Sequence, residues 1–213
     1  MTEVATIAFK EAFRLTINEK FDKKISPSEL LKNSEKVGLS GDFREIAKIK
    51  SEVSSEEASR AFLPRDGGEW SGEIGDSIWL PNRDEIPKRP PNNEKTWGEI
   101  LDENGVEGIE FKDGEPDFSK VSEATVEIQD FTVDRNANFT QADEKLADQW
   151  TSESKDGKTW TPQDVKEYRK ENNLSWHETS DMKTLDLVSQ EIHGNIPHSG
   201  GISALKNSQN QTA

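Results

Sequence analysis

Residues 174–201, with the sequence LSWHETSDMKTLDLVSQEIHGNIPHSGG, contain all three histidines of the 213-residue chain. His177 and His193 are 16 residues apart, and His198 follows His193 by five. Dense histidine tracts are typical of metal binding, because a neutral imidazole is a good ligand for a divalent ion. This stretch is therefore the strongest candidate in the chain for a metal site.

Local signals within the stretch predict two strands and a short helix. LSWHET and MKTLDLVS read as the strands of a hairpin. Ser189 is a suitable N-cap for a helix SQEIHGN, with Glu191 in its first turn and Gly194 and Pro197 at its end. Two strands and a helix can bring three imidazoles to one point while leaving positions on the ion for water and substrate.

A wider pattern carries a resemblance to a known family. Trp-His-Glu, then Leu-Val, then EIH-x-NIPHSGG resembles the ββα-metal (HNH, His-Me finger) nucleases, and in particular the colicin-like DNase/tRNase toxin domains of bacterial polymorphic toxins. The likeness extends upstream through GEWSGEIGDSIWLP, TWGEILDENGVEGIEFKDGEPDFS and TVEIQDFT. It implies an α+β fold with a ββα-metal core near the C-terminus, behind an irregular α+β front half and a helical N-terminal segment.

The resemblance also implies roles for the site residues. His177, His193 and His198 match the histidines that bind the metal or act in catalysis, and they would hold one divalent ion, which could be Zn, Mg, Mn or Ni. Colicin-type nucleases carry a second histidine after the first, a ligand followed by the general base, and Glu178 stands there in this chain. His177 is thus expected as ligand and Glu178 as base.

The alternative assignment makes His177 the base and places His193, His198 and a carboxylate on the metal. Neighbouring residues of a regular strand point to opposite faces, so Glu178 reaches the histidines only if the chain bulges or turns at residues 178–180.

The function implied by the resemblance is that of a metal-dependent endonuclease toxin that hydrolyses DNA. The alternatives are a ribonuclease or tRNase toxin with the same site, and a non-enzymatic interaction module stabilised by zinc. A structural zinc ion is coordinated by four protein ligands, whereas the metal ion of a nuclease keeps a water ligand. The expected partners are nucleic acid and a cognate immunity protein. No signal peptide is recognised at the start of the sequence, so the toxin would be made in the bacterial cytoplasm and delivered into a target cell by a separate system.

Composition limits the kind of core and the kind of metal site. The chain has no cysteine, which excludes disulfides and thiolate-bound zinc. Hydrophobic residues make up 31% and charged residues 32%, but six tryptophans and nine phenylalanines predict a modest aromatic core with irregular connections. No apolar run is long enough to cross a membrane.

The net charge of −15 weighs against a general nucleic-acid binder, because phosphate neutralisation supplies most of the non-specific affinity. Residues 151–213 carry only −2 of this charge, and the ion would add +2 at the site. Four basic residues near the site are expected either to bind the phosphates of the substrate or to form a solvated surface: Lys166, Arg169, Lys170 and Lys183. Other arginines, including Arg89 and Arg135, look isolated.

The remaining sequence suggests three segments. Residues 1–60 have helical periodicity and are interpreted as a linker or the tail of a delivery region, or alternatively as the helical half of one domain. Residues 61–205 would form the nuclease domain, with its metal site in 174–201. Residues 206–213 are expected to be disordered, as is the chain from Ala204 onwards.

Helix and strand signals also occur between residues 62 and 172. The pattern at Thr96 matches a capping box and predicts the start of a helix. Thr161, Pro162 and Asp164 predict the start of another helix, which runs to about residue 172. Residues 124–131 alternate like a strand, and residues 139–150 have helical spacing. In the helix that starts at Pro162, Val165 and Tyr168 are expected inward and Lys166, Arg169 and Lys170 outward.

Overall fold

The computed structural model describes residues 62–89 and 94–210, and these form a mixed α+β structure. The helices expected in residues 1–60 lie outside the described residues. The elements in chain order are β1 (Gly68–Trp70), β2 (Ile78–Pro81), α4 (Trp97–Glu103), β3 (Ile109–Lys112), β4 (Glu115–Asp117), β5 (Ser122–Glu127), α5 (Arg135–Ser152), the 3-10 turn η1 (Lys155–Gly157), α6 (Pro162–Glu171), β6 (Leu174–Glu178), β7 (Thr184–Ser189), α7 (Gln190–His193) and α8 (Gly201–Asn210).

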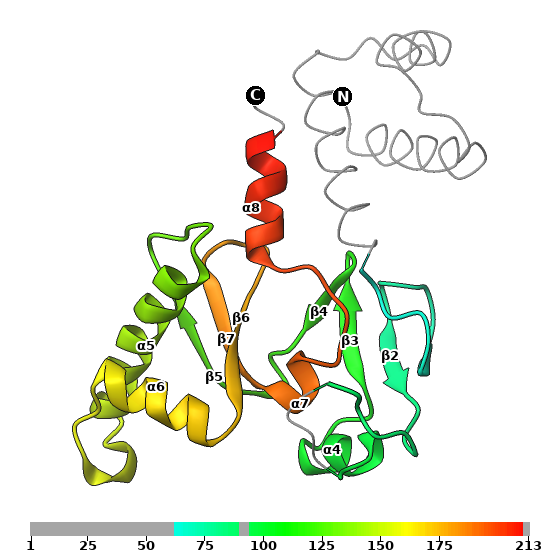
Figure 1. Ribbon diagram of the computed structural model, residues 1–213, viewed down its shortest axis with the longest axis horizontal. Helices are drawn as coiled ribbons and strands as arrows, with labels where there is room; N and C mark the ends of the chain where they lie inside the picture. Colours follow the sequence, from blue (N-terminus) through cyan, green and yellow to red (C-terminus); the bar gives the residue numbers. More distant parts are fainter. Residues whose placement is uncertain (1–61, 90–93, 211–213) are drawn as a thin grey trace, which may run out of the picture. The chain divides into compact units, whose positions relative to one another are not determined.

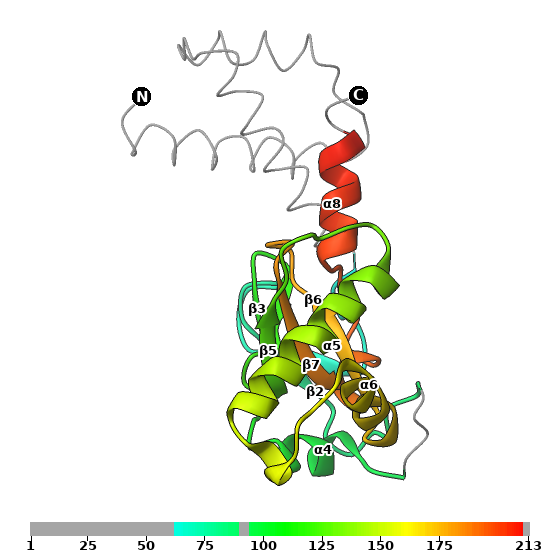
Figure 2. The same cartoon turned by 90° about the vertical axis from the view of Figure 1, so that its left-hand side faces the viewer.

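The strands form two small antiparallel sheets. Four strands pair in the order β1-β2-β3-β4, and three pair in the order β5-β7-β6. Helices α5 and α6 lie together against the three-stranded sheet, while α7 follows the β6-β7 hairpin (Figures 1 and 2). The hairpin and short helix expected around the histidines are thus confirmed.

Capping residues explain where the helices begin. The Thr96 and Thr161 hydroxyls accept the backbone N–H of Glu99 and Asp164, and both helices have the complete capping box. The Ser189 hydroxyl accepts the N–H of Glu191 at the start of α7. These three predicted helix starts are confirmed because each depends on hydrogen bonds between residues close in sequence.

Two boundaries differ from the sequence-based expectation. Helix α5 begins at Arg135, four residues early, because Asp134 caps it ahead of the apolar repeat. Strand β5 ends at Glu127 instead of residue 131.

The C-terminal segment corrects a further expectation. Where a disordered tail was expected, α8 is helical as far as Asn210. Its first residue, Gly201, lies against the backbone oxygen of Thr179 and the ring of Phe131. Ile202 and Leu205, in the first turns of the helix, are partly buried. None of the described helices is long and apolar enough to cross a lipid bilayer.

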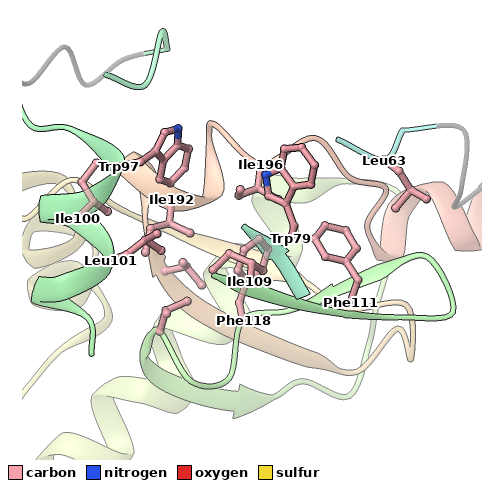
Figure 3. Close-up of a cluster of buried hydrophobic side chains, with 12 residues drawn as sticks. Leu63, Trp79, Trp97, Ile100, Leu101, Ile109, Phe111, Phe118, Ile192 and Ile196 are labelled. Carbon is pink, nitrogen blue, oxygen red and sulfur yellow. The ribbon is translucent and has the colours of Figure 1, made fainter. Parts of the chain in front are cut away.

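Two hydrophobic clusters lie on either side of the three-stranded sheet. One joins the four-stranded sheet, α4 and α7, and Figure 3 shows Ile100 and Leu101 of α4 close to Ile192 of α7, with Phe118 in the same cluster. The other joins α5 and α6 to the opposite face of the sheet, where Trp176 is buried. Because side chains alternate along β6, His177 points away from Trp176 and towards Phe118.

Candidate active site

Three imidazole rings from three parts of the fold meet at one point. His177 comes from β6, His193 from the last position of α7, and His198 from the loop that follows. Their ring centroids are 4.9 to 5.2 Å apart, and Nδ1 of His177 is 3.2 Å from Nε2 of His193. One nitrogen from each ring lies within 4.8 Å of the others, so the chain brings together the predicted three-histidine set.

Local backbone contacts return His198 to the other two histidines. Its Nδ1 is 2.7 Å from the Ile196 carbonyl oxygen, a bond in which Nδ1–H donates and Nε2 keeps its lone pair. The chain that follows His198 then passes close to the end of β6. A Cβ on Gly201 would lie 2.4 Å from the Thr179 oxygen, so only glycine fits there.

Phe118 forms the apolar floor of the site. Its ring contacts all three imidazoles edge-on, at centroid distances of 4.8 Å to His177, 5.6 Å to His193 and 5.4 Å to His198. Phe118 has no exposed surface. An apolar wall of this kind limits ring rotation and excludes water from one side of the histidines. Phe118 directly follows β4, and no local pattern in the sequence links it to the histidines.

Burial keeps the histidines neutral. It lowers the pKa of His177 well below its usual value, and repulsion from His198, His193 and Arg135 adds to this effect. Burial, together with repulsion from His198 and Arg135, lowers the pKa of His193 to about 3. Burial also lowers the pKa of His198, although its hydrogen bond to Ile196 works in the other direction. At neutral pH all three rings therefore offer lone pairs, as divalent metal ligands must.

Glu178 is turned away from the histidines, as regular strand alternation requires. Its Oε1 accepts a hydrogen bond from Asn138 Nδ2 at 2.7 Å, and its Oε2 accepts one from Arg135 Nε at 3.2 Å. Both partners belong to α5, and the Glu178 side chain is only 4% exposed. The bulge that would turn the carboxylate towards His177 does not occur, because β6 stays paired with β7 through Glu178.

Arg135 is a candidate site residue that the sequence does not single out. It is the first residue of α5, it bonds Glu178, and its side chain is 65% exposed. Its positive charge contributes to the lowered pKa of each of the three histidines. In the sequence it stands 42 residues before His177 with no basic neighbour, so no local pattern could identify it.

Asp186 is a buried carboxylate on the strand opposite His177. The two residues are directly paired across β6 and β7, so their side chains leave the same face of the sheet. Thr125 donates to Asp186 Oδ1 at 2.6 Å. Burial raises the pKa of Asp186, an effect that this hydrogen bond reduces.

The four basic residues expected along a phosphate path are not brought together. Lys166, Arg169 and Lys170 belong to α6, which packs on the face of the sheet opposite His177. The expectation that Arg169 points outward is wrong. Its Nε and Nη2 bind the two carboxylate oxygens of Asp143 at 2.7 and 2.6 Å. Lys183 pairs with Glu127 on the sheet edge at 2.7 Å.

Residues 108–200 match the family model of the DNase/tRNase domain of colicin-like bacteriocin. The matched segment contains all three histidines, Phe118, Arg135 and Glu178. No curated protein matches the chain. The family match confirms the resemblance drawn from the sequence, and it supports a nuclease toxin domain of DNase/tRNase type.

Proposed function

We propose that this chain, which is similar to colicin-like DNase/tRNase domains over residues 108–200, is a metal-dependent endonuclease toxin that hydrolyses DNA. The observation that carries the proposal is the convergence of three neutral imidazoles, all with a nitrogen within 4.8 Å of the others. In this proposal β6, β7 and α7 are the ββα-metal core. Delivery to a target cell and a cognate immunity protein follow from the resemblance as further parts of the proposal.

The donor set fits a catalytic ion better than a structural one. Within residues 62–89 and 94–210, the three histidines are joined by no fourth histidine, aspartate or glutamate. A closed structural zinc needs four protein ligands, whereas a catalytic site with three leaves a position for water or substrate. This open position favours the nuclease over the zinc-stabilised interaction module.

The residues have separate roles in the proposed reaction. His177, His193 and His198 would hold the ion, which as a Lewis acid would lower the pKa of water and offset phosphate charge. Phe118 keeps the imidazoles in place, and its lack of exposed surface closes the buried side of the cluster. Arg135 offers the phosphate an exposed guanidinium, a group suited to bidentate binding.

We assign Glu178 to holding Arg135 in place. The base role expected from the sequence is the alternative, and it requires the carboxylate to leave both Arg135 and Asn138. Glu178→Gln separates the two roles. A general base contributes roughly 10² to 10⁴-fold to the rate, whereas a glutamine still accepts one hydrogen bond at this position. We expect a loss well below 10²-fold with unchanged metal affinity, and a larger loss would support the base.

The test of the function uses the full chain with supercoiled plasmid and with total tRNA. Each substrate is incubated with Mg²⁺, Mn²⁺, Ni²⁺, Zn²⁺ or EDTA, with His193→Ala as the inactive control. Cleavage of plasmid that needs an added ion and is lost in the variant supports a metal-dependent DNase. Cleavage of tRNA alone would assign the RNase alternative. Absence of cleavage with every ion would refute the nuclease.

A further inference from the structure

Arg89 lies against the segment that connects His193 to His198. Its backbone N–H donates to Asn195 Oδ1 at 2.8 Å, and its Nη1 donates to the Gly194 carbonyl oxygen at 3.3 Å. Asn195 in turn donates through Nδ2 to the Glu191 carbonyl oxygen in α7 at 3.0 Å. A residue 106 positions before Asn195 is thereby fixed next to the histidine loop.

The charge of Arg89 is available to a ligand. Its side chain is exposed, and no carboxylate within residues 62–89 and 94–210 forms an ion pair with it. Arg83 and Arg169, by contrast, are paired with Asp102 and Asp143. The bond to Gly194 uses only one of the five N–H donors of a guanidinium.

Arg89 is also close enough to the histidine cluster to act on its electrostatics. Burial is the main cause of the lowered pKa of His198, and the positive charges of Arg135 and Arg89 add to it. Arg135 is anchored at Glu178, at the end of β6, and Arg89 is anchored at Gly194, at the end of α7. β6 and α7, which carry His177 and His193, therefore each end beside an arginine.

A local cation matters in a chain with a net charge of −15. Such a protein repels the phosphate backbone at long range, so affinity must come from contacts within about 10 Å of the bound strand. A guanidinium fixed by backbone contacts loses little freedom on binding, and it can grip a phosphate with two parallel hydrogen bonds.

We propose that Arg89 binds a backbone phosphate adjacent to the one held at the histidine cluster. The inference rests on the proposed nuclease function and extends its substrate site to a segment outside the matched residues 108–200. Arg89 thus contributes to substrate affinity, while the ion and the cleavage step depend on other residues.

The test compares Arg89→Gln with Lys88→Gln, a neighbouring exposed cation that gives the same change in charge. The probe is a fluorescent 12-base-pair DNA duplex bound by the full chain in EDTA, followed by anisotropy over a range of salt. For Arg89→Gln we expect affinity to fall on the order of 10-fold at low salt, with the slope of log K against log salt reduced by about one. Lys88→Gln should change affinity by much less.

Two further measurements separate binding from a structural role. Arg89→Gln should keep the wild-type metal affinity and thermal midpoint, since its backbone N–H still binds Asn195, and Arg89→Lys should restore part of the DNA affinity. In cleavage assays the loss should fall on KM and leave kcat nearly unchanged.

Several outcomes overturn the inference. Wild-type DNA affinity in Arg89→Gln, or an equal loss in Lys88→Gln, would remove the specific phosphate contact. A lowered metal affinity or thermal midpoint in Arg89→Gln, matching that of Asn195→Ala, would make Arg89 a structural anchor only. If the wild-type chain cleaves and binds normally in these assays, such results refute Arg89 alone, whereas a wild type that neither binds nor cleaves nucleic acid refutes the proposed function as well.

Discussion

Acid should destabilise the metal-free protein through its three clustered histidines. The pKa of His193 is lowered to about 3 in the folded chain, against a usual value of 6.5. The unfolded chain therefore binds a proton below pH 6.5 that the folded chain does not, so stability is present above pH 6.5 and is lost as the pH falls towards 3. Between pH 7.5 and 5.5 the loss is roughly 1 to 1.5 kcal/mol for one such histidine.

The other two histidines add to this effect because burial also lowers their pKa values. The total loss of stability between pH 7.5 and 5.5 should therefore exceed that of one histidine, and it is a substantial part of the usual value of about 5 to 15 kcal/mol for a domain. The measurement is urea unfolding in EDTA at pH 7.5 and 5.5, with tryptophan fluorescence as the probe.

His193→Gln is the matched variant, since it removes one titrating group from the cluster. Its stability at either pH is not informative alone, but its loss between the two pH values should be smaller than that of wild type by roughly 1 kcal/mol. Equal losses in the two proteins would show that His193 is not held neutral by burial. His193 would then not be held in the neutral state that binding of a divalent ion requires.

Three other predictions concern packing and organisation. Phe118→Ala should cost about 3 to 5 kcal/mol in urea unfolding and weaken metal binding in calorimetry, with Phe118→Leu intermediate, and unchanged metal affinity would show that the apolar floor does not position the ligands. Asp143→Ala leaves Arg169 buried without its partner, so unfolding should be easier by roughly 3 to 5 kcal/mol while DNA affinity stays unchanged, and a loss of DNA affinity instead would return Arg169 to the substrate site. A chain that starts at Ala61 should fold and cleave like the full chain, and loss of its circular dichroism signal would show that residues 1–60 belong to the same domain.

Much of the local structure was predictable because its causes are close in sequence. The helix starts at Thr96, Thr161 and Ser189 depend on side chains that cap their own backbone within three residues. The hairpin that carries His177 follows from the alternation of its strands and from its short turn. In that turn, burial alone would raise the pKa of Asp181, but hydrogen bonds from Thr179, Thr184 and Lys183 lower it to about 2. The three histidines were recognisable for the same reason, since they share one short stretch.

Only the tertiary structure decided which distant groups join those histidines. Phe118, Arg135 and Arg89 come from separate segments, and the contacts that place them join residues far apart in sequence. The tertiary structure also decided which of the expected residues lie away from the histidines. The periodicity of α6 gave Arg169 an outward position, but Asp143 of the neighbouring helix binds it inward. The sequence alone identified the three histidines of the candidate metal site, whereas packing between the elements determined their burial, their charge state and the cations around them.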